Sequence, residues 1–113
     1  MPYIGINTSK RLSDTQKDTL KTALGEKISL IPGKTERMLM VDISDGRTMY
    51  LAGEQRDLAY VDVKCFGSAE FAHRKAFTEA AFEVVQQTTR LPQDGIYLTY
   101  SEFENWGMQG TMK

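Results

Sequence analysis

Pro2, directly behind Met1, is the residue of this 113-residue chain whose position most clearly could do chemistry. Initiator methionine is usually trimmed before a small residue such as proline. Trimming would leave Pro2 with a free secondary amine at the start of the strand-like run 3–8. An α-amino group has a pKa of about 7.7–8.0, and desolvation lowers the pKa of a cationic group. Such an amine would be available as a general base at neutral pH. The competing interpretation is that proline is simply a frequent and well-tolerated second residue.

Two further residues have positions that suit ligand binding. Lys34 follows Pro32-Gly33 in the turn between a predicted helix and a strand, where a cation can face a carboxylate. Its alternative is an exposed turn lysine. Tyr97 lies in an otherwise apolar strand, and its alternative is a core or interface aromatic with a satisfied hydroxyl. His73 and Cys65 each stand alone, so we expect no metal site, cofactor or disulfide.

Composition narrows the class of protein. Apolar residues make up 41% of the chain and charged residues 26%, which is typical of a globular domain, and we expect residues 1–113 to form one domain. The net charge of −1 and the pI of about 5.8 argue against nucleic-acid or membrane-surface binding. No apolar run reaches the roughly 18 residues that cross a bilayer, and no signal peptide is recognisable. The expected location is the cytoplasm.

The apolar periodicity predicts two similar halves. Ser13 and Gln16 form a capping box ahead of an apolar stripe at helical spacing, and Pro32-Gly33 ends that helix. In the second half, Gly67-Ser68 is expected to begin a helix that ends at Leu91-Pro92. The stripes comprise Leu20, Ala23, Leu24, Ile28 and Ile31, then Phe77, Ala80, Ala81, Val84, Val85 and Thr88. Strands are predicted over 3–8, 38–44, 48–51, 58–66 and 96–101.

These elements predict an α+β (two-layer α/β) fold. Two β-α-β units, about residues 1–56 and 57–113, would form a four-stranded sheet with both helices on one face. The strands at 38–41 and 97–100 are apolar at nearly every position, unlike a sheet that faces water on one side. The second face is therefore expected to be buried against further copies of the chain.

The order of several short motifs resembles the macrophage migration inhibitory factor and D-dopachrome tautomerase family, within the tautomerase superfamily. The resemblance covers essentially the whole chain. It rests on Pro2 heading a strand that ends Ile6-Asn7-Thr8, on Gly33-Lys34, on Met49-Tyr50-Leu51-Ala52-Gly53, on Cys65-Phe66-Gly67, on Ile96-Tyr97-Leu98 and on Asn105-Trp106-Gly107 with Gly110-Thr111.

This resemblance implies a homotrimer with active sites between subunits and keto–enol tautomerisation of phenylpyruvate-like aromatic α-keto acids. It implies Pro2 as the base, Lys34 as the carboxylate ligand and Tyr97 as a contribution from a neighbouring subunit. The chain also departs from the family: Thr99 replaces an asparagine and Phe66 an isoleucine of the pocket. The resemblance implies Phe66, Trp106 and Met108 as apolar residues that line the pocket. Met108 stands in place of an aromatic residue.

Other activities stay open at this stage. The main alternative is a catalytically weak, cytokine-like binding protein of the same fold, released without a signal peptide and acting on a cell-surface receptor. Hydration or dehalogenation of unsaturated acids by the same base ranks last, because nothing in the sequence places Arg11 or Arg37 near Pro2.

Overall fold

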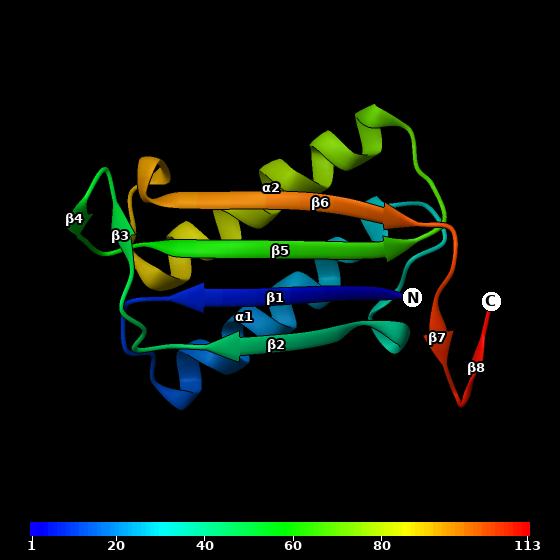
Figure 1. The fold of residues 1–113 in the computed structure, drawn as a ribbon, viewed down its shortest axis with the longest axis horizontal. Helices are drawn as coiled ribbons and strands as arrows, with labels where there is room; N and C mark the ends of the chain where they lie inside the picture. The colour runs from blue at the N-terminus through cyan, green and yellow to red at the C-terminus, as the bar shows by residue number, and fades with distance from the viewer.

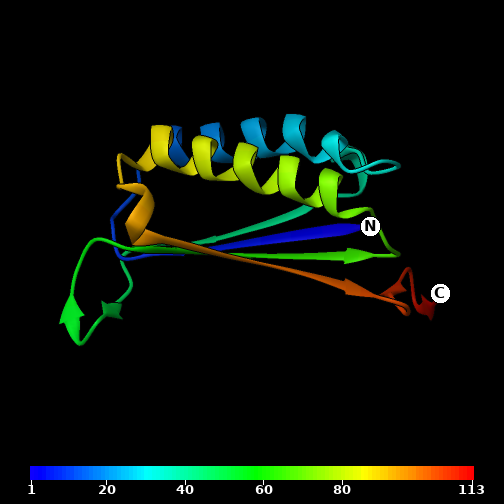
Figure 2. The ribbon, with the colours of Figure 1, turned by 90° about the horizontal axis from the view of Figure 1, so that it is seen from above.

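Two helices cover one face of a four-stranded sheet in the computed structural model, which describes residues 1–113 (Figures 1 and 2). The chain order of the main elements is β1 (Pro2–Thr8), α1 (Asp14–Lys27), β2 (Met40–Ser44), β3 (Tyr50–Leu51), β4 (Glu54–Gln55), β5 (Ala59–Phe66), α2 (Phe71–Thr89), β6 (Ile96–Phe103), β7 (Gly107–Met108) and β8 (Thr111–Met112). Single 3-10 turns lie at Ile28–Leu30, Glu36–Met38 and Gln93–Gly95.

The sheet order β2-β1-β5-β6 joins two β-α-β units at the centre. β1 is parallel to β2, and β5 is parallel to β6, whereas β1 and β5 are antiparallel. Both helices lie on the same side of the sheet (Figure 2). The predicted architecture of two β-α-β units with both helices on one face is confirmed.

The core lies between the helices and the sheet. Alternate residues of β1 and β5 are buried beneath the helices, so the strands show the period of two expected of a sheet with one covered face. The largest fully buried side chains include Phe77, Ile4, Ile6, Leu20, Leu24, Ile28, Ile31, Leu91, Val61, Val63 and Val85. Most of the predicted helix stripes are therefore core, although Ala23, Ala80 and Thr88 are only half-buried.

Helix α1 begins where its capping box predicts. The Gln16 backbone N–H donates to Ser13 Oγ at 3.1 Å, and the Ser13 backbone N–H donates to Gln16 Oε1 at 2.9 Å. Two otherwise unpaired donors of the first turn are thus satisfied. The Gln16 amide also donates to the Thr88 carbonyl at 3.2 Å, which ties the start of α1 to the end of α2.

Several predicted boundaries are wrong, among them the start of β3, which is Tyr50 rather than position 48, and the end of β6, which is Phe103 rather than position 101. α2 begins at Phe71 rather than at Gly67-Ser68, because residues 67–70 form a connection whose first residue has φ +92°. β2 begins at Met40 rather than at position 38, since the chain first makes a 3-10 turn through Met38. The first helix ends at Lys27 and a 3-10 turn carries the chain on, so that Ile31 still reaches the core.

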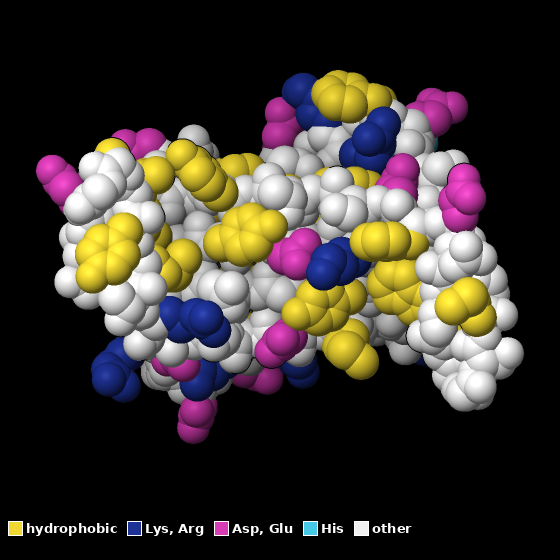
Figure 3. Space-filling view, viewed as in Figure 1, with side chains coloured by type: hydrophobic (Ala, Val, Ile, Leu, Met, Phe, Trp, Pro, Cys, Tyr) yellow, Lys and Arg dark blue, Asp and Glu magenta, His cyan; other side chains and the backbone are white.

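The uncovered face of the sheet carries both charged and hydrophobic side chains. In β2 the side chain of Ile43 packs against the core. Its neighbours Asp42 and Ser44 therefore face outward. Lys64 pairs with Asp62 at 3.2 Å, and the Tyr3 hydroxyl donates to Asp42 at 3.0 Å. Figure 3 shows these charges at the centre of the face, with hydrophobic side chains around them. Met40, Tyr97 and Phe103 are nevertheless exposed on this face, where further copies of the chain are expected to pack.

None of the helices is long and apolar enough to span a lipid bilayer.

Removing the N-cap hydroxyl should weaken α1. We expect Ser13→Ala to lower the free energy of unfolding by about 1 kcal/mol, because the Gln16 N–H loses its acceptor. Urea denaturation followed by circular dichroism measures the change. Thr22→Ala, an exposed position of the same helix, is the control and should change stability by less than about 0.5 kcal/mol. Equal effects of the two substitutions would contradict a capping role for Ser13.

Candidate functional site

Pro2 lies at the start of the central strand β1, and its side chain is buried. In the antiparallel register it stands opposite Cys65 of β5. One residue earlier, the carbonyl of Met1 accepts a hydrogen bond from the Phe66 backbone N–H at 3.2 Å. The first two residues are therefore paired with the end of β5 instead of fraying, as chain termini usually do.

Lys34 lies at the same end of the sheet. It follows the turn at Gly33, whose φ of +80° favours glycine, and its backbone N–H donates to the Ile31 carbonyl at 3.1 Å. Its half-buried side chain donates from Nζ to the Phe66 carbonyl at 2.6 Å. Phe66 therefore donates its N–H to Met1 and accepts from Lys34 through its C=O. These two hydrogen bonds bring Met1, Lys34 and Phe66 together at this end of the sheet.

The electrostatics of this end favour a neutral amine. Burial and the positive charge of Lys34 are the two largest influences that lower the pKa of the Met1 amine below its ordinary value. Lys113 lowers it further, whereas the neighbouring Cys65 raises it. Because Met1 is present in this chain, the nitrogen of Pro2 is an amide and carries no proton-accepting function here.

The C-terminal hairpin β7–β8 lies beyond the same end of the sheet, close to the N-terminus (Figures 1 and 2). Trp106 and Lys113 close the hairpin with reciprocal backbone hydrogen bonds of 3.1 and 2.9 Å. The Trp106 ring packs edge-on against Phe103 at a centroid distance of 6.2 Å. Trp106 and Met108, both half-buried, are therefore positioned at the end that also holds Pro2, Lys34 and Phe66.

Tyr97 lies towards the other end of the sheet, and Thr99 lies between the two ends, in register with Asp62. Tyr97 is 61% exposed and pairs in register with Tyr60, whereas Pro2 pairs with Cys65 of the same strand. Five residues of β5 separate these two rows, or about 17 Å at about 3.3 Å per residue. A single protomer therefore does not bring Tyr97 to Pro2.

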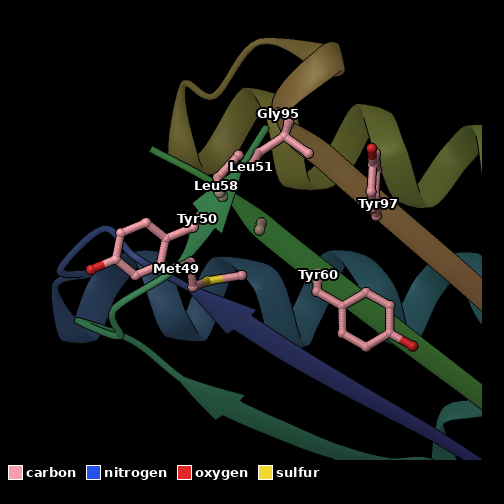
Figure 4. Close-up of a pocket in the computed structure, with 8 residues that line it drawn as sticks. Met49, Tyr50, Leu51, Leu58, Tyr60, Gly95 and Tyr97 are labelled. Carbon is pink, nitrogen blue, oxygen red and sulfur yellow. The ribbon is translucent and has the colours of Figure 1, made fainter. Parts of the chain in front are cut away.

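Tyr97 lines a small apolar pocket of about 120 Å³. Figure 4 shows Tyr97 on β6, Tyr60 on β5 and Tyr50 on β3 around this hollow. The other lining residues are Met49, Leu51, Leu58, Ala59 and Gly95. Nearby, the hydroxyls of Tyr60 and Thr99 share a hydrogen bond of 2.5 Å, so the Thr99 hydroxyl already has a partner within its own chain.

Sequence inspection missed a second group of polar residues near Pro2. Tyr100 and Glu102 lie on the helix-facing side of β6, and the Tyr100 hydroxyl donates to Glu102 Oε2 at 3.2 Å. Burial and hydrogen bonding to Cys65 raise the pKa of Tyr100 well above its usual range. Two polar residues at alternate positions of a mostly apolar strand were the available signal. No three His, Cys, Asp or Glu side chains lie close enough together to hold a metal ion.

Comparison with known proteins gives a consistent result. The family model described as macrophage migration inhibitory factor (MIF) matches residues 1–112. The crystal structure of Leishmania major MIF2 is similar with a TM-score of 0.91 and 26% identity, covering 100% of this chain and 97% of that one. A macrophage migration inhibitory factor homologue from Prochlorococcus marinus has a TM-score of 0.87, 23% identity and 97% coverage of both chains.

A third similar structure is that of Pt0534 inactivated by 2-oxo-3-pentynoate, with a TM-score of 0.86, 19% identity, and coverage of 96% of this chain and 93% of that one. No match was found among curated proteins.

The thiol of Cys65 should be unreactive in the folded protein. Its side chain is 1% exposed, and burial raises its pKa, so the thiolate needed for attack is scarce below the raised pKa. We expect labelling by a thiol-specific disulfide reagent at pH 8 to be at least roughly 100-fold slower than in the urea-unfolded chain. Comparable rates in the two states would contradict the burial of this thiol.

Proposed function

The chain belongs to the macrophage migration inhibitory factor family, and on that basis we propose that it is a tautomerase that interconverts the keto and enol forms of phenylpyruvate-like α-keto acids. The base in this proposal is the amine of Pro2, freed when Met1 is removed. The observation that carries the proposal is the buried start of β1 beside Lys34, where burial and charge together favour a neutral amine.

Moving the amine from Met1 to Pro2 strengthens this effect. Met1 is half-buried whereas Pro2 is buried, so an amine at Pro2 is more strongly desolvated. A neutral secondary amine takes a proton from the enol hydroxyl, or from the carbon next to the keto group, and the resulting ammonium returns it to the other atom. No net proton is consumed, and proton transfer by a positioned base contributes typically 10²- to 10⁴-fold to the rate.

Lys34 suits the role of carboxylate ligand. An ammonium group has three donors, and the Phe66 carbonyl accepts from this one at 2.6 Å. That bond fixes the position of Nζ and leaves the remaining donors for a substrate carboxylate. Phe66, Trp106 and Met108 are then the apolar side chains at this end that would contact the aromatic ring of the substrate.

Completing the pocket requires a second copy of the chain. Tyr97 lies about 17 Å along the sheet from the row that holds Pro2. We therefore propose a homotrimer in which Tyr97 and Thr99 of one subunit approach Pro2 of the next. The exposed Tyr50, Tyr97 and Met40 side chains, which a monomer leaves in water, support such an assembly.

One protein of this fold is known to react with a 2-oxo acid. Pt0534, which shares the fold, was solved after inactivation by 2-oxo-3-pentynoate. That compound is a 2-oxo acid, the class to which phenylpyruvate also belongs. The identity of 19% limits the likeness itself to the fold, so the substrate class rests on the chemistry of the Pro2–Lys34 end.

A binding or signalling protein with weak catalysis is the second candidate function. The observation that favours it is the hydrogen bond between Thr99 and Tyr60, which occupies the hydroxyl that stands where the family has a substrate-binding asparagine. In this alternative the trimer acts on a cell-surface receptor, and processed protein is inactive on every α-keto acid tried.

Replacing the base should abolish most of the activity. We expect Pro2→Gly to reduce kcat/KM for phenylpyruvate by roughly 100-fold, because a primary amine on a flexible residue differs in basicity and position. Activity is measured on protein whose intact mass proves the loss of Met1. Pro92→Gly, an exposed proline at the Tyr97 end, is the control and should stay fully active. Unchanged activity of Pro2→Gly would contradict Pro2 as the base.

Removing the charge of Lys34 should alter both binding and pH dependence. In Lys34→Met, we expect KM to rise roughly tenfold or more, since a charge-assisted hydrogen bond to the carboxylate is lost. The amine also loses a cation that lowers its pKa, so its pKa rises and the acidic limb of the kcat/KM profile moves to higher pH. Lys75→Met, on the exposed surface of α2, is the control. An unmoved limb would contradict the electrostatic role of Lys34.

A further inference from the structure

Glu102 lies in the same row of the sheet as Pro2. Pro2 of β1 pairs with Cys65 of β5, and Cys65 pairs with Glu102 of β6. Side chains in one row of adjacent strands project from the same face. Pro2 and Cys65 are buried beneath the helices, and Glu102 is half-buried on that side. A carboxylate is therefore placed two strands from the N-terminal residue, in an otherwise apolar layer.

The carboxylate is held by two donors. Glu102 Oε2 accepts a hydrogen bond from the Ala69 backbone N–H at 2.8 Å and another from the Tyr100 hydroxyl at 3.2 Å. Hydrogen bonds to an ionised acceptor are about twice as strong as those between neutral groups. Tyr100 packs against the buried core that includes Cys65, the residue paired with Pro2.

The carboxylate of Glu102 is one of the contacts that hold the segment 67–70. It connects β5 to α2, and the N-cap residue of α2, Glu70, makes no side-chain capping bond. Three contacts hold the segment: the Ala69 N–H donates to Glu102, the Gly67 N–H donates to the Phe103 carbonyl at 2.9 Å, and Arg74 Nε donates to the Ala69 carbonyl at 3.1 Å. A carboxylate close to this helix N-terminus also interacts favourably with the helix dipole.

The same segment fixes Lys34. Phe66, the residue before it, accepts the Lys34 Nζ hydrogen bond through its carbonyl and donates its N–H to the Met1 carbonyl. The Phe66 carbonyl belongs to the same peptide unit as the Gly67 N–H, so a shift of the segment that reaches Gly67 would also reach the Lys34 ammonium group. Lys34 has no ion pair that would hold it independently, since the four ion pairs of the chain involve other residues.

From these contacts we propose that Glu102 is a positioning residue: through Ala69 and the Phe66 carbonyl, its carboxylate holds Lys34 where a substrate carboxylate binds. This inference rests on the proposed tautomerase function for its role in binding, but the positioning of Lys34 can be tested without activity. A purely structural role, as a remote cap of α2, is the alternative. It would reduce the amount of folded protein without changing which substrates the folded protein prefers.

The first measurement compares Glu102→Gln with Glu104→Gln. Both remove one negative charge from the same end of the sheet, but Glu104 is exposed and has no hydrogen-bond partner. In wild-type protein and in both variants, after removal of Met1, kcat/KM is measured for phenylpyruvate and for its methyl ester. The ester lacks the anionic carboxylate. We expect the preference for the acid to fall roughly tenfold in Glu102→Gln and to be unchanged in Glu104→Gln. A structural cap would lower both values of kcat/KM equally and leave their ratio intact.

The second measurement requires no catalysis. Nuclear magnetic resonance of protein with ¹³C-labelled lysine reports the Cε–H signals of Lys34, with those of Lys64 and Lys75 as internal controls. We expect Glu102→Gln to shift the Lys34 signal and leave the controls in place. Tyr100→Phe, which keeps the ring but removes one donor to Glu102, should shift it less in the same direction.

The outcomes separate the two proposals. If the wild type is active and Glu102→Gln keeps the same preference for the acid, the positioning role is overturned and the proposed tautomerase function stands. An inactive wild type whose Lys34 signal still shifts in Glu102→Gln overturns the proposed function and supports the positioning role. A Lys34 signal that does not move in Glu102→Gln overturns the positioning role whatever the activity.

Discussion

The antiparallel pairing of β1 with β5 is the constraint on which the rest of the structure depends. It is the seam between the two β-α-β units, because every other pairing of the main sheet lies within one unit. It also puts the first strand of the chain in the interior of the sheet, where Pro2 is paired with Cys65. Chain termini are usually poorly ordered. Here burial and strand pairing hold the start of the chain in a fixed position.

The fold divides the candidate chemistry between the two ends of this sheet. One end gathers the N-terminus, the Lys34 ammonium group and the carbonyl of Phe66. The other end is aromatic, and Tyr97 there lines a small apolar pocket. A keto acid with an aromatic ring combines the same two properties in one small molecule. Assembly of copies end to end would therefore match the polarity of such a ligand better than either end alone.

Sequence reasoning succeeded where the determinants are local and failed where they are distant. The Ser13–Gln16 capping box spans four residues, and the structure forms it as predicted. The start of α2 was misplaced because Gly67-Ser68 resembles a helix start, whereas the segment is held by Glu102, 33 residues away from Ala69. For the site, spacing alone raised Pro2, Lys34 and Tyr97 as candidates, and their roles came from the family resemblance. No local pattern links Glu102 to Lys34, because that link passes through backbone groups of a third segment.

Both termini lie at the same end of the sheet, with the hairpin closed by Trp106 and Lys113 next to the first strand. Tandem duplication of the gene could therefore join one copy to the next through a short linker without disturbing either fold. The peptide bond that joins the copies would include the nitrogen of the first residue of the second copy. An amide nitrogen is delocalised into its carbonyl and is not basic. A fused pair would keep two folded halves but only one free amine. A single duplication would therefore produce one half without the base for proton transfer, and that half would be free to acquire another function.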